Sequence, residues 1–171
     1  YKITNYIEET INSATVKNKE ILGIGVAVPG LIDYKKGFVK LSVPLGWKNV
    51  SLKSILEKSF SYRFFIVKET HAAVRAKQIF ETTNEQSNLI FVCIGEGIGI
   101  GIVLNNKIYQ GANHMSGELG HSIVDVDGSQ CECGQNGCLD HMGSLEALKR
   151  YVKELQQESE YSTYNNSLNK I

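Results

Sequence analysis

The sequence predicts an α/β fold, because apolar runs typical of buried strands alternate along the chain with amphipathic stretches typical of helices. The strand-like runs are residues 21–28, 38–43, 64–67, 89–94, 100–104 and 122–126. The helix-like stretches are residues 1–15, 51–60, 72–80 and 144–157. A chain of 171 residues is long enough to bury a core, either as one domain or as two small lobes.

The composition argues against two broad classes of function for this chain. Its formal net charge is zero and its basic residues are spread out, so the sequence shows no basic cluster of the kind that binds nucleic acid. It has no run of eighteen apolar residues and no signal sequence at its start, so we expect a cytoplasmic protein without membrane contact. Because the chain begins with Tyr1 rather than Met, we also expect it to be a fragment of a longer protein.

Simple periodicity predicts the first helix and strand. Ile3, Ile7 and Ile11 stand at helical spacing among polar residues, which indicates an amphipathic helix. The apolar run at 21–28 stops at a Pro-Gly pair, whose chemistry favours a turn.

A second helix is expected at residues 51–60. Ser51 is its candidate N-cap, because a serine hydroxyl can accept a hydrogen bond from the first helical turn. Its inward face should comprise Leu52, Ile55, Leu56 and Phe60. The lone Trp47, just before it, is expected to pack in the core rather than to bind a ligand.

The next apolar strand, 64–67, leads through Lys68 and Glu69 into a short helix at 72–80. A carboxylate near a helix N-terminus is favoured by the helix dipole, so Glu69 has a purely structural interpretation from the residues alone. The polar stretch 81–88 then indicates a solvated linker.

Glycines alternate directly after the strand at 89–94. Gly95, Gly97 and Gly99 allow the backbone to approach a ligand or another strand closely, as in a phosphate-binding loop. We therefore expect a glycine turn followed by a second strand at 100–104. Cys93, within the first of these strands, is expected to be a small core residue.

Three thiols within eight positions, Cys131, Cys133 and Cys138, predict a metal site rather than a disulfide framework. A structural zinc takes four Cys or His ligands, so one ligand has to come from elsewhere. The sequence alone offers His121 and His141. Three reduced thiols without a metal are the alternative, although this spacing is then hard to explain.

The C-terminal part is expected to contain one strand and one helix. Residues 122–126 alternate as a strand, and Ser144 could cap a helix that runs to residue 157. The polar stretch 158–166 is expected to fray.

The glycine hairpin, the loop Gly117-Glu118-Leu119-Gly120-His121 and the Cys-x-Cys-Gly-x-x-Gly-Cys segment at 131–138 together resemble the ROK family of sugar kinases and sugar-responsive repressors, especially its xylose-repressor-like branch. The resemblance covers roughly residues 21 to 148. It implies part of an actin-like, ribonuclease-H-like bilobal fold, in which residues 1–73 end the first lobe and residues 74–171 begin the second. It also implies a structural zinc whose fourth ligand is His121.

The same resemblance implies a sugar site. In the family the counterparts of Glu118 and His121 contact the sugar, as does an acid two residues after the last Cys, which is Asp140 here. Glu69 falls on the Asp that acts as catalytic base in the kinases, with Lys68 and His71 on two flanking Asn positions. For each of these acids the plain alternative is a structural or solvated side chain.

Two functions of different class follow from the resemblance. The first is the effector domain of a ROK-type transcriptional regulator, which binds a monosaccharide without turnover. The alternative is an ATP-dependent, glucokinase-like sugar kinase. A third, blander interpretation is a zinc-stabilised interaction domain.

Three departures from the kinase pattern favour the regulator, while the question of enzyme activity stays open. The Asp-x-Gly-Gly-Thr turn of the kinases is absent, Glu96 replaces a Thr beside the phosphates, and Glu69 replaces the Asp base. The family commonly forms homodimers or larger oligomers. DNA would be bound only through an N-terminal domain that precedes Tyr1.

Overall fold

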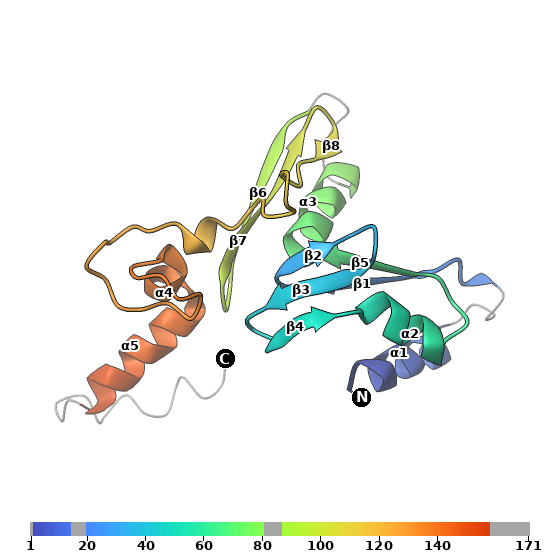
Figure 1. The fold of residues 1–171 in the computed structure, drawn as a ribbon, viewed down its shortest axis with the longest axis horizontal. Helices are drawn as coiled ribbons and strands as arrows, with labels where there is room; N and C mark the ends of the chain where they lie inside the picture. Colours follow the sequence, from blue (N-terminus) through green and yellow to red (C-terminus); the bar gives the residue numbers. More distant parts are fainter. Residues whose placement is uncertain (1, 15–19, 81–86, 158–171) are drawn as a thin grey trace. The chain divides into compact units, whose positions relative to one another are not determined.

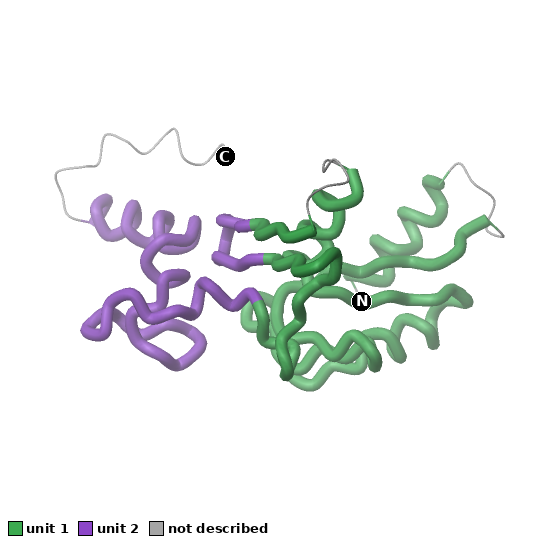
Figure 2. The backbone as a smooth tube through the Cα atoms, turned by 90° about the horizontal axis from the view of Figure 1, so that it is seen from above, with its two compact units in different colours: residues 1–91, 101–116 green, residues 92–100, 117–171 purple. Residues whose placement is uncertain are grey.

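The computed structural model describes residues 2–14, 20–80 and 87–157. Two compact units make up the chain (Figure 2). The first unit comprises residues 1–91 and 101–116, and the second comprises residues 92–100 and 117–171. The boundary between family lobes near residue 73 stays a prediction.

The first unit is a layered α/β body (Figure 1). Its elements before the hairpin are α1 (Lys2–Ser13), β1 (Ile24–Val28), β2 (Leu31–Asp33), β3 (Phe38–Ser42), β4 (Trp47–Val50), α2 (Leu52–Ser59), β5 (Phe64–Lys68) and α3 (Glu69–Phe80). Strands β1 and β5 pair in parallel, with Val28 opposite Lys68. Strands β2, β3 and β4 form a separate antiparallel sheet.

The core of this unit lies where the helices pack on the strands. Its buried side chains are Ile7, Val28, Ile32, Val39, Leu52, Leu56, Phe64 and Ile66. Strand β5 shows the reason for this selection, since Phe64 and Ile66 are buried while Phe65 between them is 57% exposed. Alternate side chains of a strand point to opposite faces, so one face of β5 meets the core.

Most elements predicted for this unit are present, with corrections around α2. Strand β4 was not predicted, and it pairs Trp47 with Ser42. Trp47 does pack against the core, as expected. Ser51 occupies the N-cap position of α2 as expected but makes no side-chain capping bond. Ile55 is 48% exposed, so its place on the inward face was wrong. A helix of eight residues buries a narrow stripe, which Leu52 and Leu56 occupy at i,i+4 spacing.

The glycine hairpin is formed by β6 (Leu89–Ile94) and β7 (Ile98–Leu104), with β8 (Lys107–Ile108) on the far side of β7. The Gly95 N–H donates to the Gly97 carbonyl at 2.9 Å and closes the turn. The second strand begins at Ile98, two residues before its predicted start. Cys93 is half-buried and lies outside the core, contrary to expectation.

One glycine of β7 is required by packing. A Cβ added at Gly101 would lie 2.1 Å from the Thr70 carbonyl oxygen and 2.7 Å from Val74 Cβ. Because real Cβ atoms do not come this close, only glycine lets β7 pass this near to α3.

The second unit contains a 3₁₀ turn, η2 (Leu119–His121), and the helices α4 (Leu139–Gly143) and α5 (Leu145–Gln157). Ser144 caps α5, because its Oγ accepts the Ala147 N–H at 3.1 Å. The short helix α4 was not predicted. No helix among the described residues is long and apolar enough to cross a membrane.

The prediction of a strand at residues 122–126 was wrong. Ile123 makes only an isolated bridge with Cys138, and Val124 and Val126 are 55% and 79% exposed. The Val124 N–H donates to the Gly137 carbonyl rather than to a neighbouring strand. The predicted linker and the predicted frayed end fall largely or wholly outside the described residues.

Candidate metal centre and the adjoining loop

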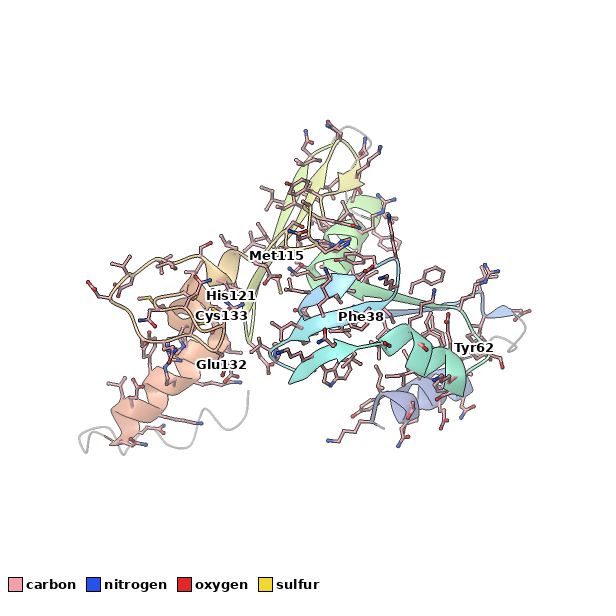
Figure 3. The ribbon with its side chains drawn as sticks, in the orientation of Figure 1. Phe38, Tyr62, Met115, His121, Glu132 and Cys133 are labelled. Carbon is pink, nitrogen blue, oxygen red and sulfur yellow. The ribbon has the colours of Figure 1, made fainter. Side chains whose placement is uncertain are left out.

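Four side chains of the second unit lie close together: His121, Cys131, Cys133 and Cys138. Their ligand atoms all lie within 4.8 Å of one another. Figure 3 labels two of these side chains, His121 and Cys133. Cys131 Sγ is 3.8 Å from His121 Nδ1, and Cys133 Sγ is 3.6 Å from Cys138 Sγ. Tetrahedral zinc bonds to sulfur and imidazole would set such pairs about 3.6–3.8 Å apart. The donor set therefore fits a single metal ion of this kind.

The structure brings His121, and not His141, to the three thiols. His141 Nδ1 lies 3.4 Å from the Arg150 guanidinium, and the His141 carbonyl accepts a bond from the same side chain. The sequence alone left these two histidines open as the fourth ligand.

Tight backbone turns close the cysteine segment around the cluster. The Cys131 N–H donates to the Gln135 carbonyl at 2.7 Å, and the Gly134 N–H donates back to the Cys131 carbonyl at 2.9 Å. Gly137 has φ +65°, and an added Cβ would lie 1.5 Å from the Asp125 carbonyl oxygen. Glycine at this position is therefore a condition for bringing Cys138 back to Cys133.

The electrostatics of the thiols also favour a bound cation. Cys131 and Cys138 are buried, whereas Cys133 is more exposed. Burial, aided by Cys133 and Cys131, raises the pKa of the Cys138 thiol to about 12. Burial on its own would raise the pKa of Cys133, but the backbone of Gln135 and the neighbouring thiols lower it. Three crowded thiols do not all ionise without a compensating cation, and a coordinated divalent metal supplies that charge.

The loop before the cluster places a carboxylate three residues from one ligand. Glu118 is half-buried and precedes η2, and its carbonyl accepts the His121 N–H at 3.1 Å. The Gly117 carbonyl accepts the Ile100 N–H at 3.0 Å. A Cβ at Gly120 would lie 2.4 Å from the Ile98 carbonyl oxygen. The loop is thus fastened to β7 on one side and to the cluster on the other.

Asp140 occupies the second position of α4 and faces the glycine turn. Its Oδ1 accepts the Ile98 N–H at 2.5 Å. An added Cβ at Gly97 or Gly120 would lie 3.3 Å or 3.0 Å from the same oxygen. Asp140 therefore ties the turn after β6 to the helix that follows the last cysteine. This bond joins residues 42 positions apart and was not predicted from the sequence.

Comparison with known proteins agrees with this arrangement. The profile of the ROK family matches residues 2–170. The chain belongs to the ROK family. It is 36% identical over 158 residues to the xylose repressor of Caldicellulosiruptor bescii, a match that covers 92% of this chain and 40% of the repressor. It is 31% identical over 163 residues to the glucokinase of Thermotoga maritima, covering 95% of this chain and 50% of that enzyme.

A solved ROK structure has the same fold. The ROK glucokinase of Streptomyces griseus, crystallised with glucose and AMPPNP, matches with a TM-score of 0.79 at 26% identity. The match covers 92% of this chain and 50% of the glucokinase chain. The predicted α/β ROK fold is confirmed, and the His/Cys cluster is consistent with the ROK zinc site. The chain spans about 40–50% of the length of these relatives.

Glu69, which the resemblance matches to the catalytic base of the ROK kinases, lies in the first unit. Glu69 is exposed and is the first residue of α3. Lys68 and His71, which the resemblance matches to two Asn positions of the kinases, are buried, at 5% and 2% exposed. Lys68 Nζ donates to the Ser116 carbonyl at 3.1 Å, and His71 bonds with Tyr34. Of the three phosphate-loop-like glycines, Gly95 and Gly97 lie in the turn and Gly99 lies within β7.

Proposed function

We propose that this ROK chain is the effector-binding part of a transcriptional regulator, which binds a monosaccharide through Glu118 and His121 without phosphorylating it. The observation that carries the proposal is the position of Glu118 in a loop fastened by backbone hydrogen bonds, three residues from a ligand of a candidate metal centre. The relationship to the C. bescii xylose repressor supports a regulator.

Zinc is the metal we propose for the cluster, because a Cys₃His donor set whose ligand atoms lie within 4.8 Å of one another is typical of structural zinc. Bound zinc would fix the imidazole ring through one nitrogen. The chain's own residues then do the recognition. His121 Nδ1 lies 3.8 Å from Cys131 Sγ, so Nε2 would donate to a sugar hydroxyl while Glu118 would accept from another. Asp140 and Glu69 are further candidate contacts.

Binding without turnover is supported by the glycine turn. A phosphate loop works through free backbone N–H groups, yet here the Ile98 N–H is engaged by Asp140 and the Gly95 N–H by Gly97. Glu96 is exposed at the same turn, where its charge opposes a triphosphate. A glutamate at the base position also displaces the carboxylate oxygens by one methylene relative to aspartate.

The second candidate function is an ATP-dependent sugar kinase. The T. maritima glucokinase, at 31% identity over 95% of this chain, is the observation in its favour. The two functions share sugar binding and differ in whether ADP is released.

The test uses the full-length protein that contains this chain. Calorimetric titration with xylose, glucose and N-acetylglucosamine is expected to show binding of at least one sugar. A coupled assay with magnesium and ATP is expected to show no ADP release that depends on this sugar. Sugar-dependent turnover on the order of 1 s⁻¹ or faster would establish the kinase instead. If no sugar binds and no ADP is released, the zinc-stabilised interaction domain becomes the better account.

The remaining features of the full-length protein are part of the same proposal. DNA would be contacted by a different domain, since the basic residues of this chain are not clustered. We expect a homodimer or larger oligomer, as is common in the family. Light scattering on the full-length protein measures its oligomeric state directly.

A further inference from the structure

The first unit contains a buried polar network that the proposed sugar contacts do not use. It is centred on His71, which is 2% exposed. Tyr34 Oη lies 2.7 Å from His71 Nδ1, and Ser116 Oγ lies 3.4 Å from His71 Nε2. Lys68, also buried, donates from Nζ to the Ser116 carbonyl. We call these four residues the His71 network.

The donors and acceptors of the network assign the proton on the imidazole. The Ser116 hydroxyl donates to the Tyr109 carbonyl at 2.6 Å, so Ser116 Oγ is left to accept from His71 Nε2–H. His71 Nδ1 then accepts from the Tyr34 hydroxyl. All these groups are satisfied together when the ring is neutral and carries its proton on Nε2.

Ring packing reinforces the same contacts. The Tyr34 ring stacks on the His71 ring, with centroids 5.6 Å apart and planes within 12°. His114 meets the Tyr34 ring edge-on at 5.4 Å. His114 is held at φ 62°, a conformation that non-glycine residues seldom adopt. The side chains of Tyr34, Lys68 and His71 thus hold residues 109–116 at the start of α3.

We propose that His71 is a positioning residue: through Tyr34 and Ser116 it clamps residues 109–116 at the start of α3. This inference rests on the proposed function in one respect, since Gly117 and Glu118 follow Ser116 directly in the chain. The clamp fixes the point from which the chain continues into the Glu118 loop. Loss of the clamp lowers sugar affinity although none of its members touches the sugar.

The hydrogen-bond pattern assigned above belongs to a neutral imidazole. A second ring proton places an N–H on Nδ1, so that the Tyr34 hydroxyl has to turn and accept instead of donating, and it adds a positive charge to a ring that shares Ser116 with the Lys68 ammonium. Among the described residues, Tyr34 after β2 contacts the ring, Lys68 at the end of β5 bonds to the carbonyl of the same Ser116, and His114 packs on the Tyr34 ring. Asp33 and Glu69 are the acids adjacent to these residues in the sequence. An unclamped histidine takes up a proton below about pH 6.5, so acidification favours the open segment.

Hydrogen–deuterium exchange of the peptide that covers residues 109–116, in the full-length protein, tests the clamp directly. Tyr34→Phe and His71→Ala are expected to raise exchange about fivefold or more, as for loss of one hydrogen bond. His71→Gln retains one donor and one acceptor and is expected to restore most of the protection. Tyr6→Phe, which removes a hydroxyl from a side chain 66% exposed on α1, is the matched control and should change nothing.

The pH profile separates a clamp from simple packing. After correction for intrinsic chemistry, exchange of this peptide should rise by up to about tenfold per pH unit below about 6.5 in the parent. It should stay flat in His71→Gln, which has no titrating ring. Equal pH profiles in the two proteins, or unchanged exchange in Tyr34→Phe, would overturn the proposal.

Sugar titrations complete the test and keep the two proposals apart. Affinity for the sugar that the parent binds should fall about fivefold in Tyr34→Phe. It should also fall in His71→Ala, and it should be higher in His71→Gln than in His71→Ala. Unchanged affinity in Tyr34→Phe and His71→Ala would contradict the positioning role. If the parent binds no sugar, the proposed function fails, and the clamp is judged by the exchange measurements alone.

Discussion

Glu118 and His121 are three residues apart in one loop, and we propose that both bind the sugar. A single substitution at Glu118 should therefore weaken sugar binding. Glu118→Gln preserves size and removes the ionised acceptor. It is expected to weaken sugar binding by about 1.5–3 kcal/mol, the range for hydrogen bonds to charged groups. Calorimetry on the full-length protein measures the loss. Glu146→Gln, which removes an exposed acid paired with Lys149 on α5, is the matched control and should bind as the parent does.

The metal ligands form a second test at the residue scale. We expect about one zinc per chain in protein purified without added metal, as measured by elemental analysis. Cys133→Ser should lose the metal, because it removes one of four ligands. Cys93→Ser and His141→Ala should retain it. Metal lost from His141→Ala and kept in His121→Ala would show that the wrong histidine was chosen.

Individual residues of the site could be predicted to different degrees. The three cysteines could be predicted as metal ligands from their spacing, because these ligands lie close together in the sequence. Spacing alone left His121 and His141 open, since both lie within about ten residues of the cysteines; the family resemblance favoured His121, which the structure brings to the thiols. The bond from Asp140 to the Ile98 N–H could not be predicted, because it depends on how α4 meets the glycine turn.

At the scale of elements, Gly101 shows how one position determines the packing of β7 on α3. Gly101→Ala is expected to cost about 1–3 kcal/mol of stability, because its Cβ would overlap the Thr70 carbonyl. Gly25→Ala in β1 is the control, since nothing lies within 4 Å of its added Cβ. Denaturant unfolding of the two variants, followed by circular dichroism, gives the comparison. Equal stability of the two would mean that β7 and α3 are not packed as described.

Elements with a clear period and a partner were predicted, and the others were not. Strands β5 and β6 follow unbroken apolar runs, and α5 follows a capped periodic stretch. Residues 122–126 have the alternation of a strand but lack a neighbouring strand, so their apolar side chains are exposed. Elements as short as β4 and α4 contain too few residues to establish a period.

At the scale of the whole molecule, the fold is that of ROK kinases and regulators alike, so fold alone does not separate the two activities. The proposed function rests instead on particular groups: an engaged Ile98 N–H, an exposed Glu96 and a glutamate at position 69. The cluster, the Glu118 loop and Asp140 all belong to the second unit, and in the proposed function they act together. Sugar binding should therefore depend on the metal.

The most direct test of this account is a calorimetric sugar titration of the full-length protein before and after removal of its metal by a chelator. We expect measurable binding in the metal-loaded protein and at least about tenfold weaker binding after removal, in line with the loss that follows when groups supporting a metal site are removed. Zinc added back should restore it. Equal affinity in the two states, or binding in neither, would contradict the claim that a metal-held loop carrying Glu118 and His121 recognises the sugar.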